Sequence, residues 1–226
     1  MNSFKNLKIG KKLILSFLTI LILTSSLSIY ILGKLSYTAN LTDYMYDGPY
    51  KLANESLGIR MEIINISRCL NSGFVDNNHT GENKTIAESF NKIEENIKSI
   101  SANELIASSI GDHLKNLENA IENYKSAYEN LYARTQVEGF TNNVNDIDAS
   151  VISTYSNTYN KVIEEASILN ENANKIMEEF LTDADKTAKQ STIISIALLI
   201  VAILGVSYIS IYITKTLRDP LVEIED

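Results

Sequence analysis

The sequence predicts an all-α protein in which an antiparallel four-helix bundle, outside the cytoplasm, is flanked by two transmembrane helices. Two apolar runs without a charged residue, 13–32 and 191–213, lie near the ends of the 226-residue chain. Between them, apolar residues recur every three or four positions, which is the period of a helix. No stretch alternates with period two for long enough to indicate a strand. The domain between the runs is expected to cover 35–190.

The two apolar runs have the length and composition of membrane spans. Twenty helical residues at about 1.5 Å each cover roughly 30 Å, the thickness of the hydrocarbon core of a bilayer. A core helix would show a polar stripe, whereas these runs contain only scattered Ser and Thr, whose hydroxyls can bond to carbonyls of their own helix. The first run is too long for a signal peptide and no cleavage pattern follows it, so we expect an uncleaved anchor.

Positively charged residues predict the orientation of the two spans. Four lysines lie in the tail 1–12 before the first span, and Lys215 and Arg218 follow the second. The positive-inside rule therefore places both termini in the cytoplasm, with the chain held in a membrane. The segment 214–226 is then expected to form a cytoplasmic connector and the start of a further helix.

The region between the spans is acidic. Of 20 Lys and Arg, four precede the first span and two follow the second, which leaves 14 between them. Of 28 Asp and Glu, four follow the second span, which leaves 24. The resulting charge, near −10, argues against a nucleic-acid partner. The single cysteine, Cys69, excludes an internal disulfide; it is either a plain thiol on a helix face or a bridge between two chains.

The apolar period divides the domain into four expected helices: 35–72, 84–100, 102–135 and 145–190. Their spacing of three and four is that of the seam in a left-handed helix bundle. The first and last helices are expected to continue into the spans. Pro49 is expected either to start a fresh helical segment or to kink a continuous one.

Local signals predict where these helices begin and end. Gly73 and Gly81 bracket one expected loop, and Gly139 lies in another. Ser101, with Glu104 three residues later, predicts a capping box that opens the third helix.

The residues of an enzyme site do not come together in this sequence. His79, in an expected loop, and His113, on a helix, have no Cys or His at the spacing of metal ligands. Adjacent carboxylates such as Glu94 and Glu95 point about 100° apart on a helix, so they do not face each other and are expected on its solvent-exposed surface. The sequence therefore predicts no catalytic residue, no metal, no cofactor and no enzyme activity.

The end of the chain, "ITKTLRDPLVEIED", resembles the start of a HAMP domain, the parallel four-helix relay that follows the second membrane helix of many bacterial receptors. There, an Ile-Thr pair and a short connector precede a Pro-Leu pair and the first relay helix. Ile213, Thr214, Pro220, Leu221 and Ile224 match this pattern. We expect Pro220 to restart the backbone as a new amphipathic helix.

Two further stretches, "FKNLKIGKKLILSFLTI" (4–20) and "MYDGPYKLANESLGIRMEI" (45–63), resemble bacterial methyl-accepting chemotaxis proteins with four-helix-bundle sensor domains. The resemblance implies a homodimeric receptor that passes a helix movement to a HAMP module and, beyond residue 226, to a coiled coil that controls a downstream kinase complex. The same input half is used by sensor histidine kinases and cyclic-dinucleotide enzymes. A membrane-anchored helical spacer without a ligand is the alternative from another class.

A ligand site can be placed by counting from the membrane. Arg68 lies 36 residues beyond Leu32, and Tyr155 lies 36 residues before Ser191, so the two are expected at the same height. An arginine with hydroxyl and aromatic groups can bind the carboxylate of an amino or organic acid. Alternatively, the tyrosines belong to the helix seam and the arginines pair with acidic neighbours. The full candidate set is Arg60, Arg68, Thr154, Tyr155, Thr158 and Tyr159.

Overall fold

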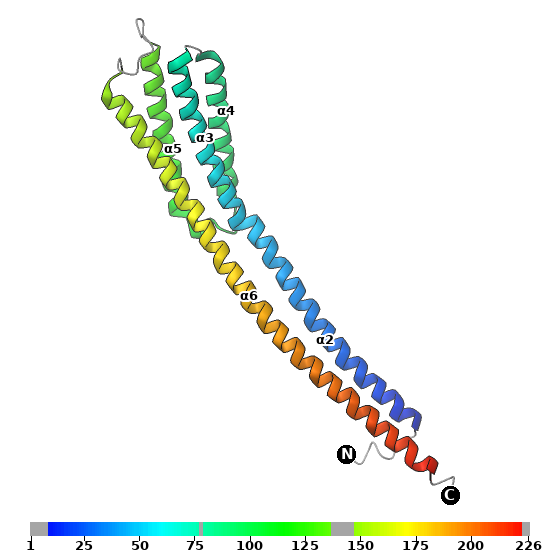
Figure 1. The fold of residues 1–226 in the computed structure, drawn as a ribbon. Coiled ribbons are helices and arrows are strands. Elements are labelled where there is room, and N and C mark those ends of the chain that lie inside the picture. Colours follow the sequence, from blue (N-terminus) through cyan, green and yellow to red (C-terminus); the bar gives the residue numbers. More distant parts are fainter. Residues whose placement is uncertain (1–8, 77–78, 137–146, 223–226) are drawn as a thin grey trace. The chain divides into compact units, whose positions relative to one another are not determined.

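The computed structural model describes residues 9–76, 79–136 and 147–222, and over these ranges the chain is helical apart from short connections (Figure 1). No strand occurs in the described ranges, which confirms the all-α prediction. The helices, in chain order, are α2 (Ile9–Met45), the π-helix η1 (Tyr46–Tyr50), α3 (Lys51–Asp76), α4 (His79–Ser101), α5 (Ala107–Thr135) and α6 (Ala149–Val222).

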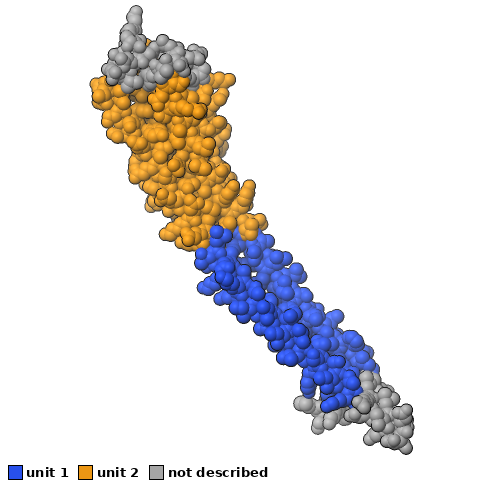
Figure 2. Space-filling view, in the orientation of Figure 1, with its two compact units in different colours: residues 1–41, 181–226 blue, residues 42–180 orange. Residues whose placement is uncertain are grey.

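The chain forms two compact units, which Figure 2 shows in different colours. Unit 1 combines residues 1–41 with 181–226, and unit 2 is Thr42–Phe180. Unit 2 contains one hydrophobic core, to which α3, α4, α5 and the first part of α6 all contribute. The periodic apolar residues of the sequence fill it. Its fully buried members include Ile59, Ile63, Ile66, Ile93, Leu117, Tyr124, Val162 and Leu169.

Polar contacts show that α3 and α4 run antiparallel. The hydroxyl of Ser99 donates to Glu55 at 3.1 Å, and Lys92 bonds to Glu62 at 3.1 Å. Residue numbers therefore fall along α4 as they rise along α3. The two helices approach closely at Gly58, where a Cβ would lie 2.7 Å from the Nδ2 atom of Asn96.

α3 and α6 also run antiparallel. The amide of Asn170 donates to the carbonyl of Ala53 at 3.0 Å, whereas Tyr155, earlier on α6, lies beside Ser67, later on α3. These two helices are thus antiparallel neighbours as well.

Pro49 lies inside η1, so α2 and α3 are joined by a π-turn. No new helix begins at the proline, so the expected fresh start there is wrong, whereas a kink in a continuous helix at Pro49 stays a prediction. A π-turn accommodates an additional residue, and such turns occur as short insertions within α-helices. Gly48 and Pro49 are buried, and a Cβ at Gly48 would lie 3.5 Å from the Cγ2 atom of Ile106.

The predicted capping box at Ser101 is wrong. Ser101 is the last residue of α4, and its hydroxyl donates to the carbonyl of Ile97 at 2.9 Å. The next helix starts only at Ala107. The amide oxygen of Asn103 instead accepts the backbone N–H of Leu105 at 3.2 Å within the connection. The serine bonds back to its own helix, as serines within helices commonly do.

The predicted loop between Gly73 and Gly81 is also too long. α3 continues to Asp76 and α4 begins at His79, so both glycines, and His79 itself, belong to helices. A glycine inside a helix costs only about 1 kcal/mol relative to alanine, which tertiary packing overrides. Gly73 is buried. The loop expected around Gly139 falls outside the described residues.

Two helical stretches, Leu13–Gly73 and Ala149–Lys215, contain runs that are long and apolar enough, by length and composition, to cross a membrane. The large apolar side chains of these runs are mostly exposed, for example Phe17, Ile29 and Leu204. Hydroxyls within the runs bond to their own helix, as the sequence predicts. For instance, Thr19 donates to the carbonyl of Leu15 at 2.8 Å.

α6 is one helix of 74 residues, and it includes Pro220. The expected restart at this proline is therefore wrong. Pro220 has no N–H to donate to the carbonyl four residues earlier, so one backbone hydrogen bond is absent there, but its fixed φ is compatible with a helix. Ile224 lies outside the described residues.

Candidate functional site

Three tyrosines from two helices meet in the core of unit 2. The ring of Tyr124, on α5, lies 5.4 Å from that of Tyr155 and 6.3 Å from that of Tyr159, both on α6. The hydroxyls of Tyr124 and Tyr155 share a hydrogen bond of 2.9 Å. Tyr124 is fully buried, and the other two pack partly buried against the core. The two α6 tyrosines of the candidate set therefore belong to the helix seam.

Burial controls the ionisation of Tyr124 and Tyr155. It raises the pKa of Tyr124 far above the usual value, and the bond to Tyr155 acts in the same direction. Burial also raises the pKa of Tyr155, although hydrogen bonds with Tyr124 and Ser67 oppose the rise. The phenols of Tyr124 and Tyr155 stay neutral at physiological pH, so these two can donate hydrogen bonds but carry no charge.

Both arginine candidates lie on α3, and Arg68 is the one placed beside this cluster. Because Ser67 contacts Tyr155, the next residue, Arg68, lies level with Tyr155, as the count along the two helices predicts. Arg68 is exposed and donates to the amide oxygen of Asn65 at 2.9 Å, not to a carboxylate. Arg60 is half-buried, and its Nε has no hydrogen-bond acceptor in the part of the chain that the structure describes.

The two threonines of the set are bonded within their own helix. Thr154 donates to the carbonyl of Ser150 at 2.8 Å, and Thr158 donates to that of Thr154 at 3.0 Å. The protons of both hydroxyls are therefore already donated within α6.

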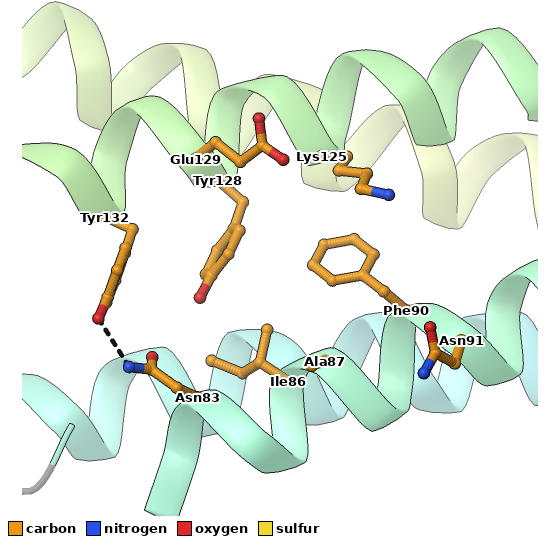
Figure 3. A pocket seen from close by; sticks show the side chains of 9 residues that line it. All are labelled: Asn83, Ile86, Ala87, Phe90, Asn91, Lys125, Tyr128, Glu129 and Tyr132. Atoms are coloured by element: carbon orange, nitrogen blue, oxygen red, sulfur yellow. Dashed lines mark hydrogen bonds between the residues drawn. The ribbon is translucent and has the colours of Figure 1, made fainter. Parts of the chain in front are cut away.

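A cavity of about 440 Å³ lies elsewhere, between α4 and α5 (Figure 3). We call it the α4–α5 groove. Its apolar lining is Ile86, Ala87, Phe90, Tyr128 and Tyr132, and its polar lining is Asn83, Asn91, Lys125 and Glu129. This combination of an apolar lining with a few polar groups is typical of small-molecule sites.

Aromatic rings dominate the groove. The ring of Phe90 lies 5.6 Å from that of Tyr128, tilted by 55°, and Tyr128 stacks on Tyr132 at 6.0 Å. The amide of Asn83 donates to the hydroxyl of Tyr132 at 2.6 Å. Burial is the main cause that raises the pKa of Tyr128 to about 12, so this phenol is also neutral at physiological pH.

Lys125 is the cation of the groove. Its ammonium lies 5.7 Å from the centre of the Phe90 ring and 3.2 Å from a carboxylate oxygen of Glu94. Both partners of this ion pair are well exposed, so the pair contributes little to stability.

Sequence reasoning missed the groove because its two walls come from different helices. Tyr124 and Tyr128 lie at seam positions of α5, and both belong to the core. Only the pairing of α4 with α5 brings Phe90 and Asn83 beside Tyr128. A signal was present in the steps of four that connect Tyr124, Tyr128 and Tyr132. This row is more aromatic than a helix seam requires.

Over residues 9–76, 79–136 and 147–222, no group of three or more His, Cys, Asp or Glu side chains is arranged to hold a metal ion. Comparison of the chain with protein-family models, with curated proteins and with solved structures finds no match.

Proposed function

We propose that this chain is the input half of a transmembrane chemosensory receptor of the methyl-accepting chemotaxis type, held in a bacterial cytoplasmic membrane. Unit 2 is its antiparallel four-helix-bundle sensor domain, α2 and α6 contain its membrane spans, and both termini are cytoplasmic. A small amino or organic acid is the stimulus, and a HAMP module and a kinase complex receive the signal. The proposal gives the chain no enzyme activity and no nucleic-acid partner.

The observation that carries the proposal is the continuity of α6. This single helix supplies core residues of unit 2, among them Val162 and Leu169, and also contains the apolar run 191–213. A continuous helix can pass a shift or rotation along its length. A ligand biases such a movement only by its different affinities for two states of the helix.

The bundle is supported by the shared core of the four helices and by the antiparallel contacts described above. A spacer protein would need the same core but no ligand and no movement of α6. Measurement of a response therefore separates the two functions.

A row of exposed apolar side chains on α3 supports the homodimer. Leu57, Met61 and Ile64 are 45%, 62% and 48% exposed, and they follow one another by four and three residues. The core face of the same helix, represented by Ile59 and Ile63, is fully buried. The same row on a second copy, related by a two-fold axis, would cover these side chains at the spacing of a coiled-coil seam.

The homodimer is tested by disulfide cross-linking in membranes. Cys69 is partly buried against the core, and its replacement by alanine gives a background without a native thiol. We expect Met61→Cys to form covalent dimers under mild oxidation. The control Glu122→Cys, at an exposed position of α5, should remain monomeric. Equal cross-linking of both variants contradicts an interface on this face of α3.

The receptor function is tested with a hybrid in which the 226 residues are fused to the HAMP and kinase-controlling part of a chemoreceptor. Cells are exposed to a panel of amino and organic acids, and kinase activity is measured. We expect at least one compound to change the activity and Arg68→Ala to weaken the response. A hybrid that forms dimers and controls the kinase, yet responds to no compound, favours the spacer.

A further inference from the structure

We propose that the α4–α5 groove binds a small aromatic carboxylic acid. The binding claim depends on the groove alone, whereas its use as a stimulus rests on the proposed function. The groove is separate from the arginine and tyrosine set on α3 and α6. Its volume of about 440 Å³ falls within the range of small-molecule pockets.

The apolar part of the ligand follows from the rings. Phe90 and Tyr128 are buried and mutually tilted, and Ile86 beside them is buried as well. Aromatic rings attract one another in tilted or offset arrangements at centre distances of about 4.5–7 Å. A ligand ring can join this set without disturbing it, whereas a flexible polar chain would leave the apolar lining uncovered.

The charge of the ligand follows from Lys125. Figure 3 shows this side chain on the Phe90 side of the groove, and the carboxylate of Glu129 lies beside the α5 backbone. Asn91 lies at the same end of the groove, on α4, and the bond between Asn83 and Tyr132 occupies the other end. A carboxylate attached to a ring beside Phe90 can therefore meet the ammonium of Lys125.

The existing partner of Lys125 does not block this contact. Glu94 holds the ammonium in an exposed pair, and a lysine ammonium has three donors, so the ligand carboxylate can share or replace it. Because Glu94 competes for Lys125, its neutralisation should strengthen binding. A merely structural role of the groove would not produce this effect.

The test is calorimetric titration of the 226-residue chain in lipid nanodiscs with benzoate, benzyl alcohol and benzylamine. We expect benzoate to bind, and the neutral and cationic analogues to bind at least about tenfold more weakly, because they lose a charge-assisted hydrogen bond to Lys125. No binding of benzoate at millimolar concentration, or equal binding of all three compounds, overturns the proposal.

Variants locate the site. Lys125→Met should weaken benzoate binding by about tenfold or more, and Glu94→Gln should strengthen it by roughly two- to fivefold. Lys115→Met, which removes another exposed lysine of α5, is the matched control and should bind like the unmodified chain. Ala87→Leu places a larger side chain in the groove at an exposed helix position and should abolish binding.

Circular dichroism and thermal unfolding confirm that each variant is folded. Benzoate binding that is unchanged in both Lys125→Met and Ala87→Leu contradicts this site. Failure of this proposal leaves the cross-linking at Met61 and the hybrid response unaffected, so the two proposals fail separately.

Discussion

Asn103 donates its side-chain amide to the main-chain carbonyl of Asp47, at 2.7 Å. The bond connects the turn between α4 and α5 to the π-helix that contains Pro49. The hydroxyl of Tyr44 adds a second link, to the carbonyl of Leu105 at 3.0 Å. The π-turn, where the proline lacks an N–H donor, is therefore supported from outside the helix.

We expect Asn103→Ala to lower the free energy of unfolding by about 1–2 kcal/mol, because it removes the bond to Asp47 and the acceptor for the N–H of Leu105. Amide hydrogen exchange over residues 46–50 should accelerate in the variant. The control is Asn119→Ala, at an exposed position of α5. If the two variants unfold alike, the link does not stabilise the π-helix.

A second expectation concerns the close packing of α3 on α4 at Gly58. Gly58→Ala gains helix propensity, but its Cβ would lie 2.7 Å from Nδ2 of Asn96, so that side chain must move. We expect the alanine to give little or no stabilisation alone, and to stabilise by about 0.5–1 kcal/mol when Asn96→Ala is also present.

Gly111→Ala is the matched control for this cycle, because nothing lies within 4 Å of a Cβ at that position. It should stabilise the chain by about 0.5–1 kcal/mol without any second change. Thermal unfolding measures the stability of Gly58→Ala, Asn96→Ala, the double variant and Gly111→Ala. Strict additivity of Gly58→Ala and Asn96→Ala would show that the approach imposes no cost.

Alkaline pH should destabilise unit 2 through Tyr128. Its pKa is raised from 10.0 to about 12 in the folded chain, chiefly by burial. Below pH 10 the phenol is protonated in both states, so its contribution is fully present. Between pH 10 and 12 only the unfolded chain loses the proton, and up to roughly 2–3 kcal/mol of stability is lost.

Denaturant unfolding between pH 8 and 12 tests this loss by comparison of the unmodified chain with Tyr128→Phe. The variant has no phenol to titrate at this position, so its stability should fall less over the window from pH 10 to 12. Parallel curves for the two proteins would exclude Tyr128 as the source. Burial raises the pKa of Tyr124 as well, and this residue is unchanged in both proteins.

The helical structure and the identity of the core residues could be predicted from the sequence, because both depend on how often apolar residues recur along the chain. Ile59, Ile63 and Ile66 recur at helical spacing, and all three are fully buried. Helix ends were less accessible to sequence reasoning, because a local signal competes with tertiary packing. Ser101 has the sequence of a cap, yet its hydroxyl bonds back to Ile97.

The candidate sites show a different limit. The count from the two apolar runs placed Arg68 level with Tyr155, and the contact of the neighbouring Ser67 with Tyr155 agrees with it, although the count passes through η1. It did not reveal that Thr154 and Thr158 bond within their own helix, which depends on rotamers. The α4–α5 groove needed the pairing of two helices, and no spacing within one helix shows that pairing.

The most direct test of the receptor proposal is whether the polypeptide crosses a membrane twice. In a Cys69→Ala background, Glu122→Cys and Lys215→Cys place single thiols at exposed positions of unit 2 and of the end of α6. A membrane-impermeant maleimide is applied to intact spheroplasts. We expect labelling of the cysteine at position 122 at once, and of that at 215 only after permeabilisation. Labelling of both from the same side of the intact membrane would contradict the proposed topology and, with it, the receptor function.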